Sequence, residues 1–220
     1  MELLIMDADE LQNHEKFQKA MELVGAERRN KVEKLLKAER KRLSLAAGLL
    51  LKYAFFSAGH SDLYEEIQIT EHGKPYLPRH EFYFSLSHSG RFAICGFSDN
   101  PIGCDIEKAR EKLPRTEKIF SPDEANIFGK LEDDKKISFF FHLWTCKESV
   151  AKWIGKGIAY PFESFSVMGG EQVNHSVFIN ETELFLKSFY KENYTISLCA
   201  QSAEFPKEMQ KLDWNILMNH

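Results

Sequence analysis

The spacing of the hydrophobic residues changes repeatedly along the chain, and this order constrains the fold more than any other feature of the sequence. After a short predicted strand in "ELLIMDA" (2–8), helical spacing runs from about residue 14 to residue 58. Short strand-like segments occupy residues 66–107, and helical spacing returns in 120–128 and 134–154 before further strand-like segments. The order helix, strands, helix, strands predicts an α+β fold.

This order predicts two halves of similar size that meet near "SDNP" (98–101). We expect a first half over residues 1–100 and a second half over residues 101–220. Ser121, followed by Pro122 and Glu124, predicts the start of a helix through a capping box. The strands predicted for the end of the chain are "ESFSVM" (163–168), "HSVFIN" (175–180), "ELFLKSFY" (183–190) and "YTISLCAQ" (194–201).

Composition excludes several classes of protein. The formal net charge is -4, so no global basic surface indicates a nucleic-acid partner. No signal peptide opens the sequence, and no apolar run approaches the roughly 20 residues of a membrane span. The 4 cysteines are scattered without a Cys-x-x-Cys pair, which is typical of reduced thiols. We expect a cytoplasmic protein that binds neither nucleic acid nor membrane.

Two carboxylates interrupt the apolar strand "PIGCDIEK" (101–108). Asp105 and Glu107 are two positions apart and point to one face of the strand, while Cys104 and Ile106 point to the other. Two like charges this close raise each other's cost of ionisation unless a positive charge lies between them. The pair is therefore a solvated polar face, a partner of an arginine, or part of a metal site.

A third carboxylate lies in the predicted helix "WTCKESVAK" (144–152). Glu148 and Lys152 are one turn apart, so the simplest interpretation is an ordinary salt bridge on a solvated face. The flanks of this helix are mostly apolar, however, and charges on an apolar helix favour a cleft. Glu148 could meet Asp105 and Glu107 there, and three carboxylates together with substrate phosphates suit Mg²⁺.

Three other segments carry groups that bind phosphate. "RRNKVEKLLKAERKR" (28–42) is strongly basic, although a solvated helix face explains most of its charges. "HGKPY" (72–76) projects Lys74 from a turn, and such turns are common. "SLSHSGRFA" (85–93) offers hydroxyls, an imidazole and backbone N–H groups to an anion, but it is equally typical of a hydrogen-bonded loop. No acid is positioned to complete a hydrolase triad.

Four motifs in this order and spacing, "GKPY", "FSLSHSG", "IGCDIEK" and "WTCKESVAK", resemble the phosphopantetheinyl transferases. The likeness is to the larger, monomeric, broad-specificity type of the surfactin-synthetase-activating class. One visible departure is Cys104, which replaces the usual branched aliphatic residue. The resemblance implies a monomer of two pseudo-symmetric α/β halves, with coenzyme A bound in the cleft between them.

The resemblance also implies the reaction. The serine hydroxyl of an apo acyl or peptidyl carrier protein would attack the β-phosphate of coenzyme A and release adenosine 3′,5′-bisphosphate. Asp105, Glu107 and Glu148 would ligate Mg²⁺. Glu148 would accept the serine proton, and Lys147 would stabilise the leaving phosphate. The carrier would dock near "IFSPDEANIF" (119–128).

The coenzyme A contacts implied by the resemblance come from both halves. They are Lys147 and Lys152 on the phosphates, Lys74 and Pro75 at the adenine and phosphate end, Ser87 and His88 on the 3′-phosphate side, and Arg28 and Lys31 as basic phosphate contacts, with Arg40, Arg42 and Ser44 as further candidates. Two alternatives stay open. One is a metal-dependent nucleotide phosphodiesterase or pyrophosphatase, and the other is a non-catalytic module that binds coenzyme A or a carrier.

Overall fold

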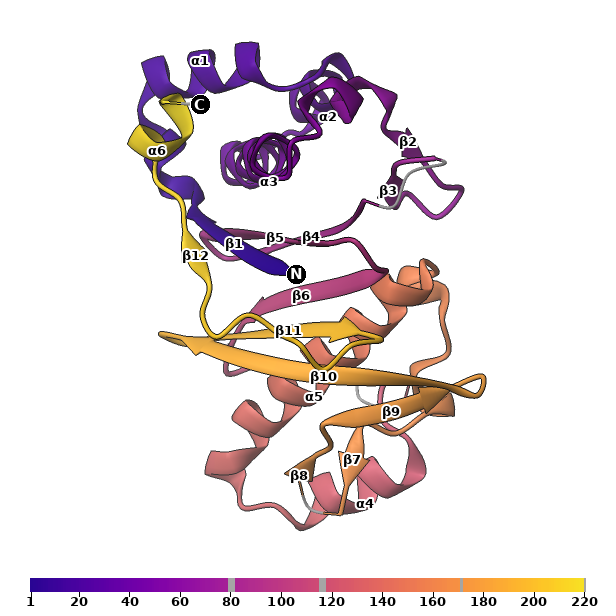
Figure 1. Ribbon diagram of the computed structural model, residues 1–220. Coiled ribbons are helices and arrows are strands. Elements are labelled where there is room, and N and C mark those ends of the chain that lie inside the picture. The colour runs from indigo at the N-terminus through magenta and orange to yellow at the C-terminus, as the bar shows by residue number, and fades with distance from the viewer. Residues whose placement is uncertain (79–81, 115–117, 171, 220) are drawn as a thin grey trace. The chain divides into compact units, whose positions relative to one another are not determined.

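The chain consists of two compact units of mixed helix and sheet, which confirms the α+β class (Figure 1). The computed structural model describes residues 1–78, 82–114, 118–170 and 172–219. The first unit comprises Met1–Asp99 and Pro206–His220, and the second comprises Asn100–Phe205. Residues 206–220, which the sequence places in the second half, belong instead to the first unit because strand β12 pairs in parallel with strand β1, with Leu4 opposite Gln210.

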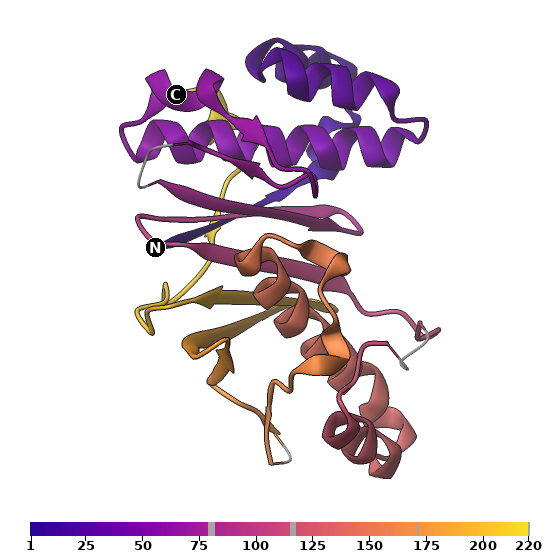
Figure 2. The same ribbon diagram turned by 90° about the vertical axis from the view of Figure 1, so that its right-hand side faces the viewer.

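The first unit packs helices on a four-stranded sheet of order β12-β1-β5-β4. The long helix α3 lies along this sheet and is seen end-on in Figure 1 and lengthwise in Figure 2. Its elements are β1 (Glu2–Asp7), a 3-10 helix η1 (Ala8–Gln12), α1 (His14–Leu23), α2 (Ala26–Lys34), α3 (Ala38–Ser57), η2 (Ser61–Glu66), β2 (Gln68–Ile69), β3 (Pro75–Tyr76), β4 (Tyr83–Ser89), β5 (Phe92–Ser98), β12 (Gln210–Lys211) and α6 (Trp214–Met218).

The helical spacing over 14–58 predicts one helical region, and the structure divides it into three helices. Val24 and Gly25 adopt extended backbone between α1 and α2, and Leu35 and Lys37 do so between α2 and α3. Hydrophobic spacing continues across such breaks because all three helices turn their apolar faces to the same core. The spacing predicted the buried positions Val32, Leu43, Ala46, Leu50 and Ala54 correctly, but it missed the breaks, and Leu36 at the second break is exposed.

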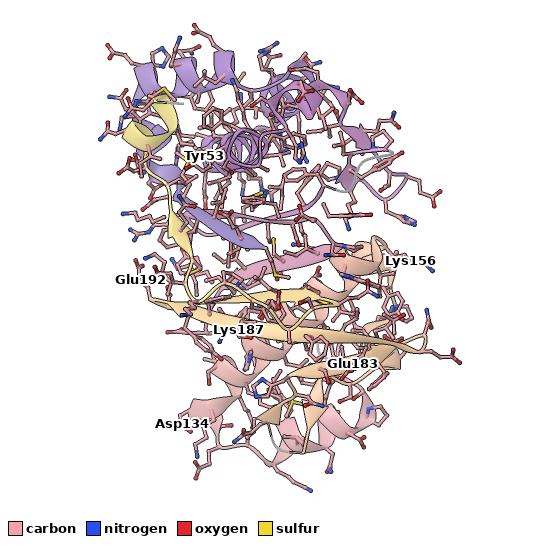
Figure 3. The ribbon with its side chains drawn as sticks, viewed as in Figure 1. Tyr53, Asp134, Lys156, Glu183, Lys187 and Glu192 are labelled. Atoms are coloured by element: carbon pink, nitrogen blue, oxygen red, sulfur yellow. The ribbon has the colours of Figure 1, made fainter. Side chains whose placement is uncertain are left out.

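The second unit packs helix α5 on a sheet of order β6-β11-β10-β9, with its core between them. Its elements are β6 (Ile102–Lys108), α4 (Pro122–Lys130), α5 (Asp133–Ile154), 3-10 helices η3 (Gly157–Ala159) and η4 (Phe162–Ser164), β7 (Met168–Gly169), β8 (Gln172–Val173), β9 (Ser176–Ile179), β10 (Thr182–Lys191) and β11 (Tyr194–Ala200). The charged side chains of Asp134, Glu183 and Lys187 are exposed on this unit (Figure 3).

Most predicted elements of the second unit are confirmed. Ser121 caps α4 in the predicted capping box, with the side chain of Glu124 accepting from the Ser121 backbone N–H. The predicted strand at 163–168 is wrong, because η4 (Phe162–Ser164) covers its first two residues and β7 begins only at Met168. In the described part of the chain, no helix is both long enough and apolar enough to cross a membrane.

Candidate active site

The two strand carboxylates lie on β6, as the alternation of the strand predicts. Asp105 is opposite Ser197 and Glu107 is opposite Thr195 in the antiparallel pairing with β11. Asp105 is only 5% exposed, whereas Glu107 is half-buried nearer the end of the strand. The carboxylate of Asp105 is thus held in the layer between the sheet and α5.

Lys152 of α5 reaches across this layer to Asp105. Its Nζ donates to Asp105 Oδ1 at 2.7 Å, so its ion pair joins the helix to the strand. A solvated salt bridge from Glu148 to Lys152 is therefore not the arrangement of this helix. Burial by itself would lower the pKa of Lys152, but the negative charges of Asp105 and Glu148 outweigh burial and raise it.

Glu148 lies one helical turn before Lys152 and is 7% exposed. Burial raises the pKa of Glu148 to about 7, and the negative charges of Asp105 and Glu107 add to this effect while Lys152 opposes it. The structure therefore brings all three predicted carboxylates within electrostatic reach of one another. A cation beside them would relieve their mutual repulsion, and Lys152 already supplies one to Asp105.

The close approach of α5 to β6 depends on Gly103. A Cβ at this position would lie 1.9 Å from the backbone oxygen of Ser149 and 2.6 Å from the backbone nitrogen of Trp153. The indole Nε1 of Trp153 also donates to the backbone oxygen of Pro101 at 3.1 Å. The sequence reasoning did not explain Gly103, although a glycine inside a strand is itself a signal of close backbone approach.

The donor chemistry of the three carboxylates fits Mg²⁺, which prefers oxygen ligands. Among the residues that the structure describes, no group of three or more His, Cys, Asp and Glu side chains is arranged so that it could hold a metal ion. Mg²⁺ sites in phosphate enzymes, however, commonly use one or two carboxylates together with substrate phosphates. Asp105, Glu107 and Glu148 therefore fit a shared site with a phosphate ligand better than a closed protein cage.

Lys147 does not lie with these carboxylates. Its side chain is fully buried, and its Nζ donates to the backbone oxygens of Phe162 and Phe165 at 2.7 Å each and pairs with the Glu124 carboxylate. The structure thus does not support the phosphate contact or leaving-group role that the resemblance implies for Lys147. The sequence reasoning gave Glu124 only a capping role and missed this ion pair, because nothing in the local pattern links residues 124 and 147.

In the first unit, Arg28 lies against α3. Its Nη1 is 3.5 Å from the backbone oxygen of Ser44, and a Cβ at Gly48 would come within 2.9 Å of its Cγ. Burial lowers the pKa of Arg28, and burial together with the charge of Arg28 lowers the pKa of Lys31. The Ser44 hydroxyl is buried and, within the described residues, has no hydrogen-bond partner. Two cations and an unsatisfied hydroxyl favour an anion ligand here.

The remaining predicted residues of the first unit lie on strands β3 and β4, in the turn before β3, and on helix α3. Gly73 adopts φ 80°, as the turn predicts, and Lys74 and Pro75 are half-buried beside it. Ser87 is buried and His88 exposed on β4, consistent with their alternation along the strand. The last two candidates are Arg40, which is exposed, and Arg42, whose Nη2 lies 3.6 Å from Asp9 Oδ1.

Comparison with known proteins covers nearly the whole chain. Residues 101–199 match the 4′-phosphopantetheinyl transferase superfamily, and residues 12–98 match the family described as 4′-phosphopantetheinyl transferase, N-terminal. The 4′-phosphopantetheinyl transferase ffp of Bacillus subtilis is 31% identical over 94% of this chain and 95% of its own length. The 4′-phosphopantetheinyl transferase Sfp of Bacillus subtilis strain 168 is 29% identical over the same shares.

Proposed function

Because the chain belongs to the 4′-phosphopantetheinyl transferase superfamily, we propose that it transfers the phosphopantetheine arm of coenzyme A to a serine of an apo acyl or peptidyl carrier protein. The serine Oγ forms a bond to the β-phosphorus as the bond to adenosine 3′,5′-bisphosphate breaks. The observation that carries the proposal is the convergence of Asp105, Glu148 and Lys152 where α5 meets β6. These are three of the charged positions in the motifs "IGCDIEK" and "WTCKESVAK" that resemble the family, and Glu107 and Lys147 are among the others.

Each residue of this cluster has a distinct part in the proposed reaction. Asp105, Glu107 and Glu148 would hold Mg²⁺, which when bound would offset the negative charge of the coenzyme A pyrophosphate. Glu148 accepts the proton of the attacking serine, directly or through water, since a positioned carboxylate can serve as a general base. Lys152 fixes Asp105 through their ion pair and contacts the phosphates.

We propose further coenzyme A contacts among the residues of the first unit. Arg28, Lys31 and Ser44 bind the 3′-phosphate, a role supported by the two neighbouring positive charges and by the unsatisfied hydroxyl of Ser44. The remaining contacts are Lys74 and Pro75 at the adenine and phosphate end, and Ser87 and His88 on the 3′-phosphate side. We propose further that the enzyme acts as a monomer in the cytoplasm, and its four buried free cysteines are compatible with a reducing compartment.

The proposed reaction predicts a mass change in the carrier. Incubation with coenzyme A, Mg²⁺ and an apo carrier protein should add the mass of phosphopantetheine to the carrier, measured on the intact protein. Excess EDTA should slow this gain about 100-fold or more, because the pyrophosphate charge is then uncompensated. Added Mg²⁺ should restore the rate. Release of adenosine 3′,5′-bisphosphate without a carrier would instead support the hydrolase alternative, and binding without turnover would support the binding module.

Removal of the Ser44 hydroxyl is expected to weaken coenzyme A binding without lowering the stability of the fold. Ser44→Ala should weaken coenzyme A binding about 10-fold or more, because a hydrogen bond to a charged phosphate is lost. It should not lower the melting temperature, because the removed hydroxyl is buried without a partner in the described structure. Calorimetric titration with coenzyme A and with dephospho-coenzyme A measures this effect. Affinity for dephospho-coenzyme A should stay unchanged, and an equal loss for both ligands would contradict the placement of the 3′-phosphate.

A further inference from the structure

A fully buried ionic cluster lies beside the carboxylate site, on a different side of α5. The ammonium of Lys147 has three oxygen partners, namely the Glu124 carboxylate and the backbone oxygens of Phe162 and Phe165. It also lies 4.7 Å from the centre of the Phe165 ring, which adds a cation–π contact. All three N–H donors of the ammonium can therefore be satisfied without solvent or substrate.

Glu124 is the other half of this cluster, and its side chain is 0% exposed. Its Oε2 accepts from the backbone N–H of Ser121 at 2.8 Å, and its Oε1 accepts from the backbone N–H of Val167 at 2.8 Å. One carboxylate thus joins the start of α4, the middle of α5 and the segment that leads into β7. The ion pair fixes three segments that are far apart in the sequence.

The ion pair between Lys147 and Glu124 has a direct consequence for Glu148, the residue that follows Lys147. Successive residues of an α-helix are about 100° apart around its axis, so a contact at Lys147 fixes the rotation that aims Glu148. On the side of α5 that faces β6, the Lys152–Asp105 pair holds the same helix. We propose that Lys147 and Glu124 act as a positioning pair that sets the orientation of Glu148 for transfer, and that Lys147 does not touch coenzyme A.

The kinetic part of the test rests on the proposed function, whereas the hydrogen-exchange part rests only on the contacts of Lys147 and Glu124. The test uses the full chain with Lys147→Met, Glu124→Gln and the double variant, and Lys135→Met as a control on the exposed surface of α5. Three quantities are measured: kcat with a saturating carrier, the Kd of coenzyme A by calorimetry, and amide hydrogen exchange of segments 119–131, 143–152 and 160–168.

The expected result is a fall in kcat of about 10- to 100-fold in each single variant, because a small displacement of a catalytic group has effects of this size. The Kd of coenzyme A should change less than about 2-fold, whereas loss of a charged phosphate contact would weaken it about 10-fold or more. The double variant should lose little more than the worse single variant, since both changes break one interaction. Exchange should accelerate in all three segments, and Lys135→Met should change none of these quantities.

Other outcomes overturn the proposal in distinguishable ways. A weakened Kd for coenzyme A would make Lys147 a ligand of the substrate, and an unchanged kcat with accelerated hydrogen exchange would leave the pair a purely structural role. Additive losses in the double variant would give the residues independent roles. If Lys147→Met does not fold, Glu124→Gln carries the same test, because it retains the size of the side chain. If the unaltered chain transfers nothing, the proposed function fails, and unchanged exchange in 143–152 would still overturn the positioning.

Discussion

Glu148→Gln is expected to lower the rate of phosphopantetheine transfer about 1000-fold while leaving the metal-free protein at least as stable as before. The loss combines a proton acceptor with a metal ligand, each of which contributes factors of 100 or more. Stability should be retained or rise, because burial and the charges of Asp105 and Glu107 oppose the ionised form of Glu148. Intact-mass kinetics and thermal unfolding in EDTA measure the two effects.

Asp105→Ala is the matched comparison for this prediction. It should lower the rate of transfer to a similar extent. It should also destabilise the fold by about 2–4 kcal/mol, because Lys152 loses its partner in a mostly buried position. The two carboxylates thus differ in their effect on stability although both serve the reaction. A fall in melting temperature for Glu148→Gln equal to that for Asp105→Ala would contradict the electrostatic account of the site.

Sequence patterns predicted those parts of the fold that depend on local chemistry. The capping box at Ser121 and Glu124 was predictable because both partners lie within one helical turn. The strand at 163–168 was predicted wrongly, because apolar alternation does not distinguish a strand from an extended segment whose backbone groups bind elsewhere. Here the oxygens of Phe162 and Phe165 accept from Lys147, so these groups bind a side chain.

The candidate site was predictable only in part, for a related reason. Strand alternation places Asp105 and Glu107 on one face, and helical spacing places Glu148 and Lys152 on one face of α5. Neither the strand alternation nor the helical spacing indicates which part of the fold each face contacts. Lys147 and Glu148 are adjacent in the sequence, yet one enters a buried ionic cluster and the other faces the strand carboxylates. That difference depends on the packing of α4 and η4 against α5.

Gly103→Ala is expected to disrupt the site without altering any charged group. The added methyl would lie 1.9 Å from the backbone oxygen of Ser149, and backbone cannot yield as a flexible side chain can. Helix α5 must therefore move away from β6, which separates Lys152 from Asp105. Overpacking of this kind costs about 3 kcal/mol or more. At roughly 2–4 °C per kcal/mol for a chain of this size, the melting temperature should fall by about 6–12 °C.

The matched control is Gly129→Ala in α4, where an added Cβ meets nothing within 4 Å. Alanine is favoured over glycine inside a helix by up to about 1 kcal/mol, so this variant should be as stable as the unaltered chain or slightly more stable. Transfer should fall at least about 100-fold in Gly103→Ala, since Glu148 moves with α5, and should be unchanged in Gly129→Ala. If Gly103→Ala melted and reacted like the unaltered protein, the close approach of α5 to β6 could not be what assembles the carboxylate site.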